Sequence, residues 1–219
     1  MSDGRRGTPF LVAAPSGTGK TTLCRAVMER DSGLRFSVSH TTRAPRAGEH
    51  DGIDYSFVDA AEFRRLVDAN AFLEHAEYAG NLYGTSWDAL EGPIGEGCDL
   101  LVEIEVRGAG QVRERREDVC FIFLLPPSME ELERRLRDRG TDAEDVIQKR
   151  LAEASNELAA ADIFDFAVVN DDLETAVAAV LEIVHAVRAG DGASLAARFG
   201  REAVLERWRR GGDPHAGGI

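Results

Sequence analysis

Lysine is almost absent from this chain of 219 residues: only Lys20 and Lys149 occur, and arginine supplies every other cation. Lysine and arginine together number 26 against 39 acidic residues, which gives a formal net charge of −13 at pH 7. This negative charge argues against binding to a nucleic acid polymer or to an anionic membrane surface, because both would be repelled. A small anionic ligand held by a few well-placed cations remains compatible with it.

Cysteine and long apolar runs are scarce as well. The three cysteines, Cys24, Cys98 and Cys120, are odd in number and widely spaced, which matches neither a disulfide framework nor a zinc site. We expect them to be small buried side chains in a reducing compartment. No stretch approaches the roughly 18 apolar residues of a membrane-spanning helix, and the apolar run 10–14 is too short for a signal peptide. These absences predict a cytoplasmic protein without a membrane partner.

What the chain does contain is a series of apolar strands that alternate with helices. The expected strands are 9–14, 98–106, 119–127 and 164–170. Continuous apolar strands separated by helices are typical of a parallel sheet that is covered on both faces. A polar, arginine-rich block at about 39–88 has turn signals and short strand-like runs, and it interrupts this alternation. The pattern therefore predicts an α/β fold with an inserted subdomain.

The segment APSGTGKTT (14–22) lies between the first expected strand and the first expected helix. It matches the phosphate-loop pattern GxxxxGK[ST], except that Ala14 replaces the first glycine. Gly17 and Gly19 allow the backbone to aim successive N–H groups at an anion, and the helix N-terminus adds partial positive charge. Lys20 can reach the β- and γ-phosphates, and the Thr21 hydroxyl can ligate Mg²⁺. A flexible turn before a helix is the alternative, which the register of strand, lysine and helix disfavours.

Further motifs follow in order along the chain. They are SHTTRAPRAGEHDGIDY (39–55), FLEHAEYAGNLYGTS (72–86), RRLRDRGTD (134–142), QKRLAEA (148–154) and VVNDDLE (168–174). With the phosphate loop, they resemble the guanylate kinase family, whose members phosphorylate GMP to GDP at the expense of ATP, over roughly residues 9–188. The resemblance implies a three-layer P-loop NTPase fold with a parallel core sheet, an inserted mixed-β GMP-binding subdomain and a helical lid. It also implies a role in purine nucleotide metabolism.

The resemblance divides the chain into four parts. They are a P-loop core domain (1–38, 89–127 and 156–189), a GMP-binding subdomain (39–88), a lid (128–155) and a C-terminal extension (190–219). The extension lies beyond the usual end of the family. Its apolar residues Leu195, Phe199, Val204 and Trp208 have near-helical spacing, so we expect it to pack against the core or a second copy of the chain. The sequence therefore leaves open whether the chain forms a homodimer.

The polar block carries the expected acceptor site. Arg43 and Arg46 flank Pro45, and two guanidinium forks can enclose a phosphate dianion. A solvated loop is the ordinary reading of an isolated arginine pair, and the surrounding motif favours the phosphate site. The resemblance implies that GMP, or dGMP, is bound by Ser39, Arg43, Arg46, Glu49, Tyr55, Glu74, Tyr83, Gly84, Thr85 and Glu105.

Recognition of guanine needs an acceptor for its N1–H and N2–H₂ donors, and one carboxylate can serve both. The resemblance places that carboxylate at Glu74, in an apolar run, and a hydroxyl for O6 at Thr85. The family's usual acidic DID followed by Gln-Gly is replaced here by Glu103, Glu105 and Arg107. The resemblance still implies a guanine contact for Glu105 and a place near Mg²⁺ for Glu103, against the alternative of two ordinary acids at a strand end.

Arginines are expected to complete the reaction site. Arg135 and Arg139 are four residues apart and share a helix face. The resemblance implies a catalytic set, Lys20, Arg43, Arg135, Arg139 and Arg150, and an ATP site made of Ala14, Pro15, Ser16, Gly17, Thr18, Gly19, Lys20, Thr21, Thr22, Asn170 and Asp171, with Thr21 on Mg²⁺. Arg134 and Arg137 are expected instead to pair with Glu131 or Glu133 on the same helix.

Three other functions would share part of this sequence pattern. A related kinase could act on another phosphorylated acceptor, such as ribose 1,5-bisphosphate, but Glu74 and Thr85 disfavour it. A non-catalytic module could bind phosphopeptides through the acceptor block, but such modules lack a working phosphate loop and the arginines of the lid. A regulatory GTPase is disfavoured because VVNDD lacks the lysine of an Asn-Lys-x-Asp motif.

Overall fold

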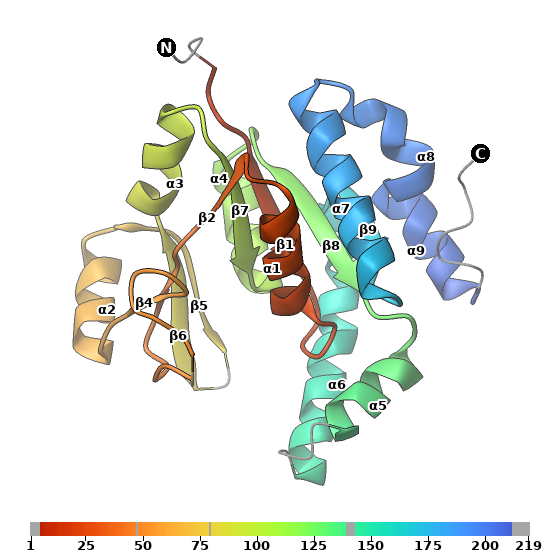
Figure 1. Cartoon of the computed structure of the whole chain (residues 1–219). Helices are drawn as coiled ribbons and strands as arrows, with labels where there is room; N and C mark the ends of the chain where they lie inside the picture. Colours follow the sequence, from red (N-terminus) through yellow and green to blue (C-terminus); the bar gives the residue numbers. More distant parts are fainter. Residues whose placement is uncertain (1–4, 47, 79, 139–142, 212–219) are drawn as a thin grey trace. The chain divides into compact units, whose positions relative to one another are not determined.

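The computed structural model describes residues 5–46, 48–78, 80–138 and 143–211 (Figure 1). The chain forms two compact units, Met1–Phe10 with Ser32–Val119 and Leu11–Asp31 with Cys120–Ile219. The division falls inside the first strand, β1 (Pro9–Ala13), whose PFLVA side chains are all buried. Each unit is described by itself below.

The first unit combines a parallel strand pair with a separate mixed sheet. Its elements are β2 (Leu34–Phe36), β3 (His40–Thr41), β4 (Ser56–Phe57), α2 (Ala60–Asp68), β5 (Phe72–Tyr78), β6 (Asn81–Ser86), α3 (Trp87–Gly95), β7 (Asp99–Ile104) and α4 (Val106–Arg115). β2 pairs with β7 in parallel. The mixed sheet has the order β4-β3-β6-β5, with β3 parallel to β4 and antiparallel to β6. The predicted insertion of a mixed β segment is confirmed.

Helix α2 covers the mixed sheet through an aromatic stack. Asp59 caps the helix by accepting a hydrogen bond from the Glu62 N–H at 2.8 Å, which satisfies one of the free amides of the first turn. Phe63 is fully buried and stacks on Phe72 of β5 with ring centroids 4.6 Å apart. The single apolar stripe of this short helix therefore fixes it to β5.

Helix α3 contains Gly92 and Pro93, two residue types that disfavour the interior of a helix. The helix runs without interruption from Trp87 to Gly95 with Pro93 inside it. Ser86 caps it by accepting from the Ala89 N–H at 3.2 Å, and Leu90 and Ile94 are fully buried. Burial of these two side chains outweighs the hydrogen bond that proline removes from the last turn.

The second unit holds the rest of β1 and the C-terminal half of the chain. Its elements are α1 (Lys20–Arg30), β8 (Cys120–Leu125), α5 (Met129–Asp138), α6 (Glu144–Ala159), η1 (Ala161–Ile163), β9 (Phe166–Val169), α7 (Leu173–Arg188), η2 (Gly192–Leu195), α8 (Ala196–Phe199) and α9 (Arg201–Arg209). β8 pairs with β9 in parallel, as β2 pairs with β7 in the first unit. This confirms the predicted parallel core sheet. Among the described residues, no helix is both long and apolar enough to cross a bilayer.

The C-terminal extension, as far as residue 211, packs on its own unit. Packing against the core is one of the two roles that the sequence predicts for it. α9 contacts β9, and the Trp208 indole N–H donates to the Pro126 carbonyl at 2.6 Å. The near-helical spacing of the extension is interrupted at Gly200, which lies between α8 and α9 and forms an antiparallel bridge with Phe166 at the edge of the sheet. A Cβ at Gly200 would overlap the carbonyl group of Ala196 in α8, so the close junction of the two helices favours glycine.

Removing an apolar anchor of the extension should destabilise the fold. Leu205 is 4% exposed, so Leu205→Ala is expected to lower the free energy of unfolding by about 2–5 kcal/mol. Arg209→Ala, on the exposed side of the same helix, is the matched control and should cost less than about 0.5 kcal/mol. Urea denaturation followed by circular dichroism measures both. Equal stability of the two variants would show that the extension is not part of the folded unit.

Candidate functional site

The phosphate loop joins the end of β1 to the start of α1 within the second unit. Gly17 and Gly19 have φ values of 93° and 96°, a left-handed conformation that favours glycine. Lys20 is the first residue of α1, and Gly19 occupies the N-cap position without a side-chain cap. The loop therefore presents backbone amides and a lysine at a positively polarised helix end, which is the arrangement that binds phosphates.

Neighbouring elements pack closely on both glycines. A Cβ on Gly17 would lie 2.9 Å from Leu136 Cδ2 of α5, and one on Gly19 would lie 2.8 Å from Asn170 Nδ2. The Asn170 amide donates to the Thr18 carbonyl at 2.7 Å, and Thr18 is fully buried. Asn170 follows β9, so the carboxyl end of this strand holds the loop in shape. Asn170, which is predicted as part of the ATP site, therefore contacts the phosphate loop directly.

Arg135 is held beside the loop by an acid of its own helix. Its Nε donates to Glu131 Oε1 at 2.8 Å, and its Nη1 donates to the Asn170 carbonyl at 3.1 Å. Hydrogen bonds from Arg134 and Arg135 lower the pKa of Glu131 to about 2. Glu131 is therefore ionised at every physiological pH and orients the Arg135 guanidinium.

A pocket of about 440 Å³ brings these groups together. It is lined by Gly17, Thr18, Gly19, Thr22, Arg135, Asp138, Asn170, Asp171 and Leu173. The sequence predicted most of these residues but missed Asp138 and Leu173. Asp138 lies three residues after Arg135, on the same helix face, and Leu173 begins α7 two residues after Asp171, so spacing is the signal that could have found both.

Arg139 and Arg150 are the other arginines that the sequence predicts for the reaction site. Arg150 lies on α6 and does not line the pocket, within the part of the chain that the structure describes. Arg139 lies outside the described residues. The expected surface pairs are confirmed: Arg134 contacts Glu131 at 2.7 Å, and Arg137 contacts Glu133 at 2.7 Å.

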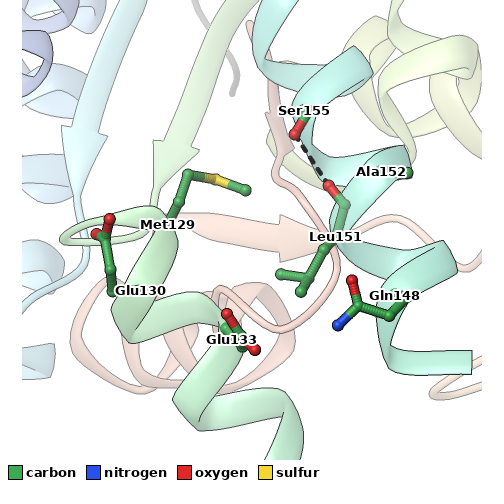
Figure 2. Close-up of a pocket in the computed structure, with 7 residues that line it drawn as sticks. All are labelled: Met129, Glu130, Glu133, Gln148, Leu151, Ala152 and Ser155. Atoms are coloured by element: carbon green, nitrogen blue, oxygen red, sulfur yellow. Dashed lines mark hydrogen bonds between the residues drawn. The ribbon is translucent and has the colours of Figure 1, made fainter. Parts of the chain in front are cut away.

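A second pocket, of about 360 Å³, lies between α5 and α6 (Figure 2). Met129 and Leu151 form its apolar wall, and Glu130 and Glu133 carry carboxylates at its edge. No cation lines it among the described residues, so its charge repels a nucleotide phosphate. The pocket at the phosphate loop, which has Arg135 and the helix end, is the better nucleotide site of the two.

In the first unit, Arg43 is the centre of a cluster of polar and aromatic side chains. Its Nη2 donates to Glu49 Oε1 at 2.9 Å, and the Glu49 Oε2 accepts from the Arg46 backbone N–H at 2.8 Å. The guanidinium carbon lies 5.4 Å from the Tyr55 ring centroid, a cation–π distance. The Tyr83 ring packs edge-on against Tyr55 with centroids 6.2 Å apart. This arrangement fixes a guanidinium fork beside two phenols, which suits a phosphate.

The charges of the pair Arg43–Glu49 support each other. Burial is the largest single influence and disfavours the charged form of both groups, but their mutual hydrogen bond and charge attraction, added to contributions from Tyr83 on Arg43 and from Arg46 on Glu49, together outweigh it. The pKa of Arg43 is raised and the pKa of Glu49 is lowered as a result. Both side chains therefore keep their charge over the whole physiological range. Sequence reasoning missed the Thr41 hydroxyl, which accepts from the Arg43 backbone N–H at 3.1 Å and shapes the turn.

A buried polar pair lies on the neighbouring strands. Glu74 is 4% exposed and Thr85 is 1% exposed. One oxygen of Glu74, Oε1, accepts from both the Thr85 N–H at 2.9 Å and its hydroxyl at 2.7 Å. The Ser39 and Thr85 hydroxyls are 3.3 Å apart. A carboxylate kept away from water in this way needs such partners, and a buried acid at the end of a hydroxyl chain is suited to reading hydrogen-bond donors of a base.

The other predicted acceptor residues lie on or near the same sheet. Gly84 pairs with His40 and His75 in the strands on either side, and Tyr83 lies opposite Thr41. The Arg46 residue is exposed on its loop. Glu105 occupies the N-cap position of α4, but its side chain accepts no hydrogen bond from the backbone amides of the first turn. The structure therefore brings together Ser39, Glu74 and Thr85 in one group and Arg43, Glu49, Tyr55 and Tyr83 in another.

Protein ligands for a metal ion are few in the described chain. It contains no group of three or more His, Cys, Asp or Glu side chains that could hold a metal. Thr21 lies in the first turn of α1, next to Lys20. Magnesium commonly takes one or two protein oxygens, with phosphates and water as its other ligands, so a hydroxyl at this place fits Mg²⁺ carried by a nucleotide.

Comparisons with known proteins agree on one family. The family described as guanylate kinase matches residues 6–187. The guanylate kinase of Neisseria gonorrhoeae is 49% identical over 188 residues, which cover 86% of this chain and 92% of that protein. The guanylate kinase of Aromatoleum aromaticum is 50% identical over 182 residues, 83% of this chain and 89% of that protein. The crystal structure of guanylate kinase from Anaplasma phagocytophilum matches with a TM-score of 0.67 and 36% identity, covering 83% and 86% of the two chains.

Proposed function

The chain belongs to the guanylate kinase family and transfers the γ-phosphoryl group of ATP to GMP, and we propose that its two groups of polar residues divide this reaction between them. The phosphate-loop pocket binds ATP, and the cluster on the mixed sheet binds GMP. An oxygen of the GMP phosphate attacks the γ-phosphorus, and the bond to the bridging oxygen breaks, which leaves GDP and ADP. The acceptor phosphate is already anionic, so the reaction requires no general base.

The donor site uses the residues predicted for it. The backbone of residues 14–19 and the first turn of α1 cradle the phosphates, Lys20 neutralises charge on the transferred group, and Asn170 and Asp171 lie toward the adenine. Arg135 and Arg150, with Arg139, add positive charge when ATP is bound. Magnesium, held by Thr21 and the phosphates, would neutralise charge on the β- and γ-oxygens. Because catalysis of phosphoryl transfer is chiefly positioning and electrostatic stabilisation, cations account for most of the rate.

The acceptor site separates phosphate recognition from base recognition. Ser39, Arg43, Arg46, Tyr55 and Tyr83 hold the phosphate, and Glu49 keeps Arg43 in place. Glu74 reads the N1–H and N2–H₂ donors of guanine, Thr85 reads O6, and Gly84 and Glu105 complete the pocket. The observation that carries this assignment is the burial of Glu74 with its hydrogen bonds from Thr85. Neither group contacts the ribose 2′ position in this scheme, so dGMP is also accepted.

The proposed function also assigns a role to each part of the chain and a location to the enzyme. The core (1–38, 89–127 and 156–189), the GMP-binding subdomain (39–88) and the lid (128–155) act as separate parts, with the extension 190–219 attached to the core. Mobile arginines on a lid would suppress hydrolysis of ATP by water. We place the enzyme in the cytoplasm without nucleic acid or membrane partners, and a homodimer is the one assembly proposed.

The substrate range tests this proposal. Release of ADP is followed in a coupled assay with GMP, dGMP, AMP and ribose phosphates as acceptors, each at the same ATP and Mg²⁺ concentration. We expect turnover with GMP and dGMP only. Turnover with AMP or a ribose phosphate would contradict the role of Glu74, and no turnover with any nucleotide would favour a phosphopeptide-binding module.

A further inference from the structure

One face of α4 contacts strand β5 on both sides of the base-reading Glu74. Gly108, Gln111 and Arg115 are three and four residues apart, so they lie along one face of the helix. α4 and β5 contact each other, and both belong to the first unit. Gln111 and Arg115 lie outside the motifs of the family resemblance, whereas Gly108 is the glycine that follows Arg107 in one of them. Each of the three makes a different contact with the strand.

Gln111 acts as a hydrogen-bonding partner for the free edge of β5, which is the outer strand of the mixed sheet. Its Nε2 donates to the His75 carbonyl at 2.8 Å, and its Oε1 accepts from the His75 N–H at 3.2 Å. A side-chain amide that pairs with both backbone groups of one residue replaces a missing neighbouring strand at that position. The residue after Glu74 is therefore fixed to α4.

Arg115 fixes the backbone just before Glu74. Its Nη1 donates to the carbonyls of Leu73 and, at 3.3 Å, Phe72. The pairing of β5 with β6 shifts register between Phe72 and Glu74, which marks a β-bulge at this place. A bulge changes the direction in which the following side chain points, so Arg115 stabilises the irregularity that aims Glu74.

Gly108 gives the carboxylate its space. A Cβ on this residue would lie 2.9 Å from Glu74 Cδ and closer still to Oε2, while Ile104 Cγ1 would be 3.0 Å away. Glu74 cannot retreat freely, because it is buried and its Oε1 is bonded to Thr85. Any side chain at position 108 must displace the carboxylate or separate α4 from β5.

We propose that α4 positions the Glu74 carboxylate that recognises guanine. Gly108 leaves space for the carboxylate against the helix, and Gln111 and Arg115 hold the backbone of β5 on either side of Glu74. The three are positioning residues and touch no substrate themselves. The proposal rests on the proposed role of Glu74 in recognising guanine. Its consequence is that selectivity for the guanine 2-amino group depends on α4.

The test compares GMP with IMP, which lacks the 2-amino group. Gly108→Ala is expected to lower kcat/KM for GMP by about 10–100-fold, the effect of losing one charge-assisted hydrogen bond. The kcat/KM for IMP should fall much less, so the ratio between the two substrates falls, and KM for ATP should stay within about twofold. Gly92→Ala in α3 is the matched control, because a Cβ there has no atom within 4 Å. It should leave both constants unchanged.

Two more variants test the proposal even if Gly108→Ala fails to fold. Gln111→Ala and Arg115→Met remove the strand contacts without adding bulk near Glu74, and each should lower the same substrate ratio. Thermal unfolding of every variant measures any loss of stability. If all three variants keep the natural ratio of GMP to IMP, or lower both constants equally, the proposal is overturned. Failure of the proposed function is a separate result: the natural enzyme would then show no preference for GMP over IMP.

Discussion

We expect the Lys20→Met variant to turn over about 10²–10³-fold more slowly than the natural enzyme, with KM for GMP changed by less than about twofold. Lys20 begins α1 directly after Gly19, where loop amides and the helix end already favour phosphate. Negative charge on the transferred phosphoryl group is spread over its oxygens in the transition state, and a fixed cation stabilises it without reorganisation. Arg135 still lines the pocket at the phosphate loop, so we expect activity to be reduced rather than abolished. Steady-state kcat at saturating ATP and GMP is the measurement.

The scarcity of lysine supplies a matched control for this experiment. Lys149 is the only other lysine in the sequence; its side chain is 76% exposed, and its ammonium group lies 4.0 Å from Glu153. An exposed pair at that distance contributes little, so Lys149→Met should retain natural kinetics. Methionine is a good helix former and has an unbranched side chain nearly as long as that of lysine, so both variants should fold. If the two variants lost the same activity, Lys20 would have no special role.

Structural features whose determining residues are consecutive in the chain are the ones that can be predicted from the sequence. The phosphate loop has all its determinants within nine residues, and the positive φ values of Gly17 and Gly19 agree with the pattern. The apolar strands were recognised because a strand buried on both faces needs no polar residue, as in the fully buried CFIFLL of β8. Buried parallel strands and local turns are therefore legible without knowledge of their neighbours.

Features that depend on distant residues were not predictable in the same way. The importance of Gly108 arises from the approach of Glu74, 34 positions earlier in the chain, and the family pattern around Gly108 does not reveal that contact. The bridge between Gly200 and Phe166 also joins residues that are far apart in the sequence, so the near-helical spacing of the extension does not predict it. Helix α3 continues through Pro93 because Leu90 and Ile94 are buried, and helix propensities do not predict that burial. In each case a tertiary contact overrides the local preference.

The Glu74→Gln variant should lose about 10²-fold in kcat/KM for GMP while KM for ATP stays within about twofold. The carboxylate accepts two charge-assisted hydrogen bonds from guanine in the proposed complex, each contributing about 1.5–3 kcal/mol. The amide of glutamine can accept only through its oxygen, and it presents an N–H₂ donor to another donor. Its oxygen can still accept from the Thr85 N–H and hydroxyl, so the mixed sheet should keep its structure.

Glu77→Gln makes the same chemical change on the same strand at an exposed position, and it should leave both constants unchanged. Steady-state kinetics with GMP varied at saturating ATP, and the reverse, separate the two sites. A Glu74→Gln enzyme with natural GMP kinetics would remove Glu74 from the reading of the base, and the buried pair with Thr85 would then have only a structural role. A loss confined to GMP, beside a Lys20→Met variant impaired chiefly in kcat, would instead assign base recognition to the mixed sheet and charge stabilisation to the phosphate loop.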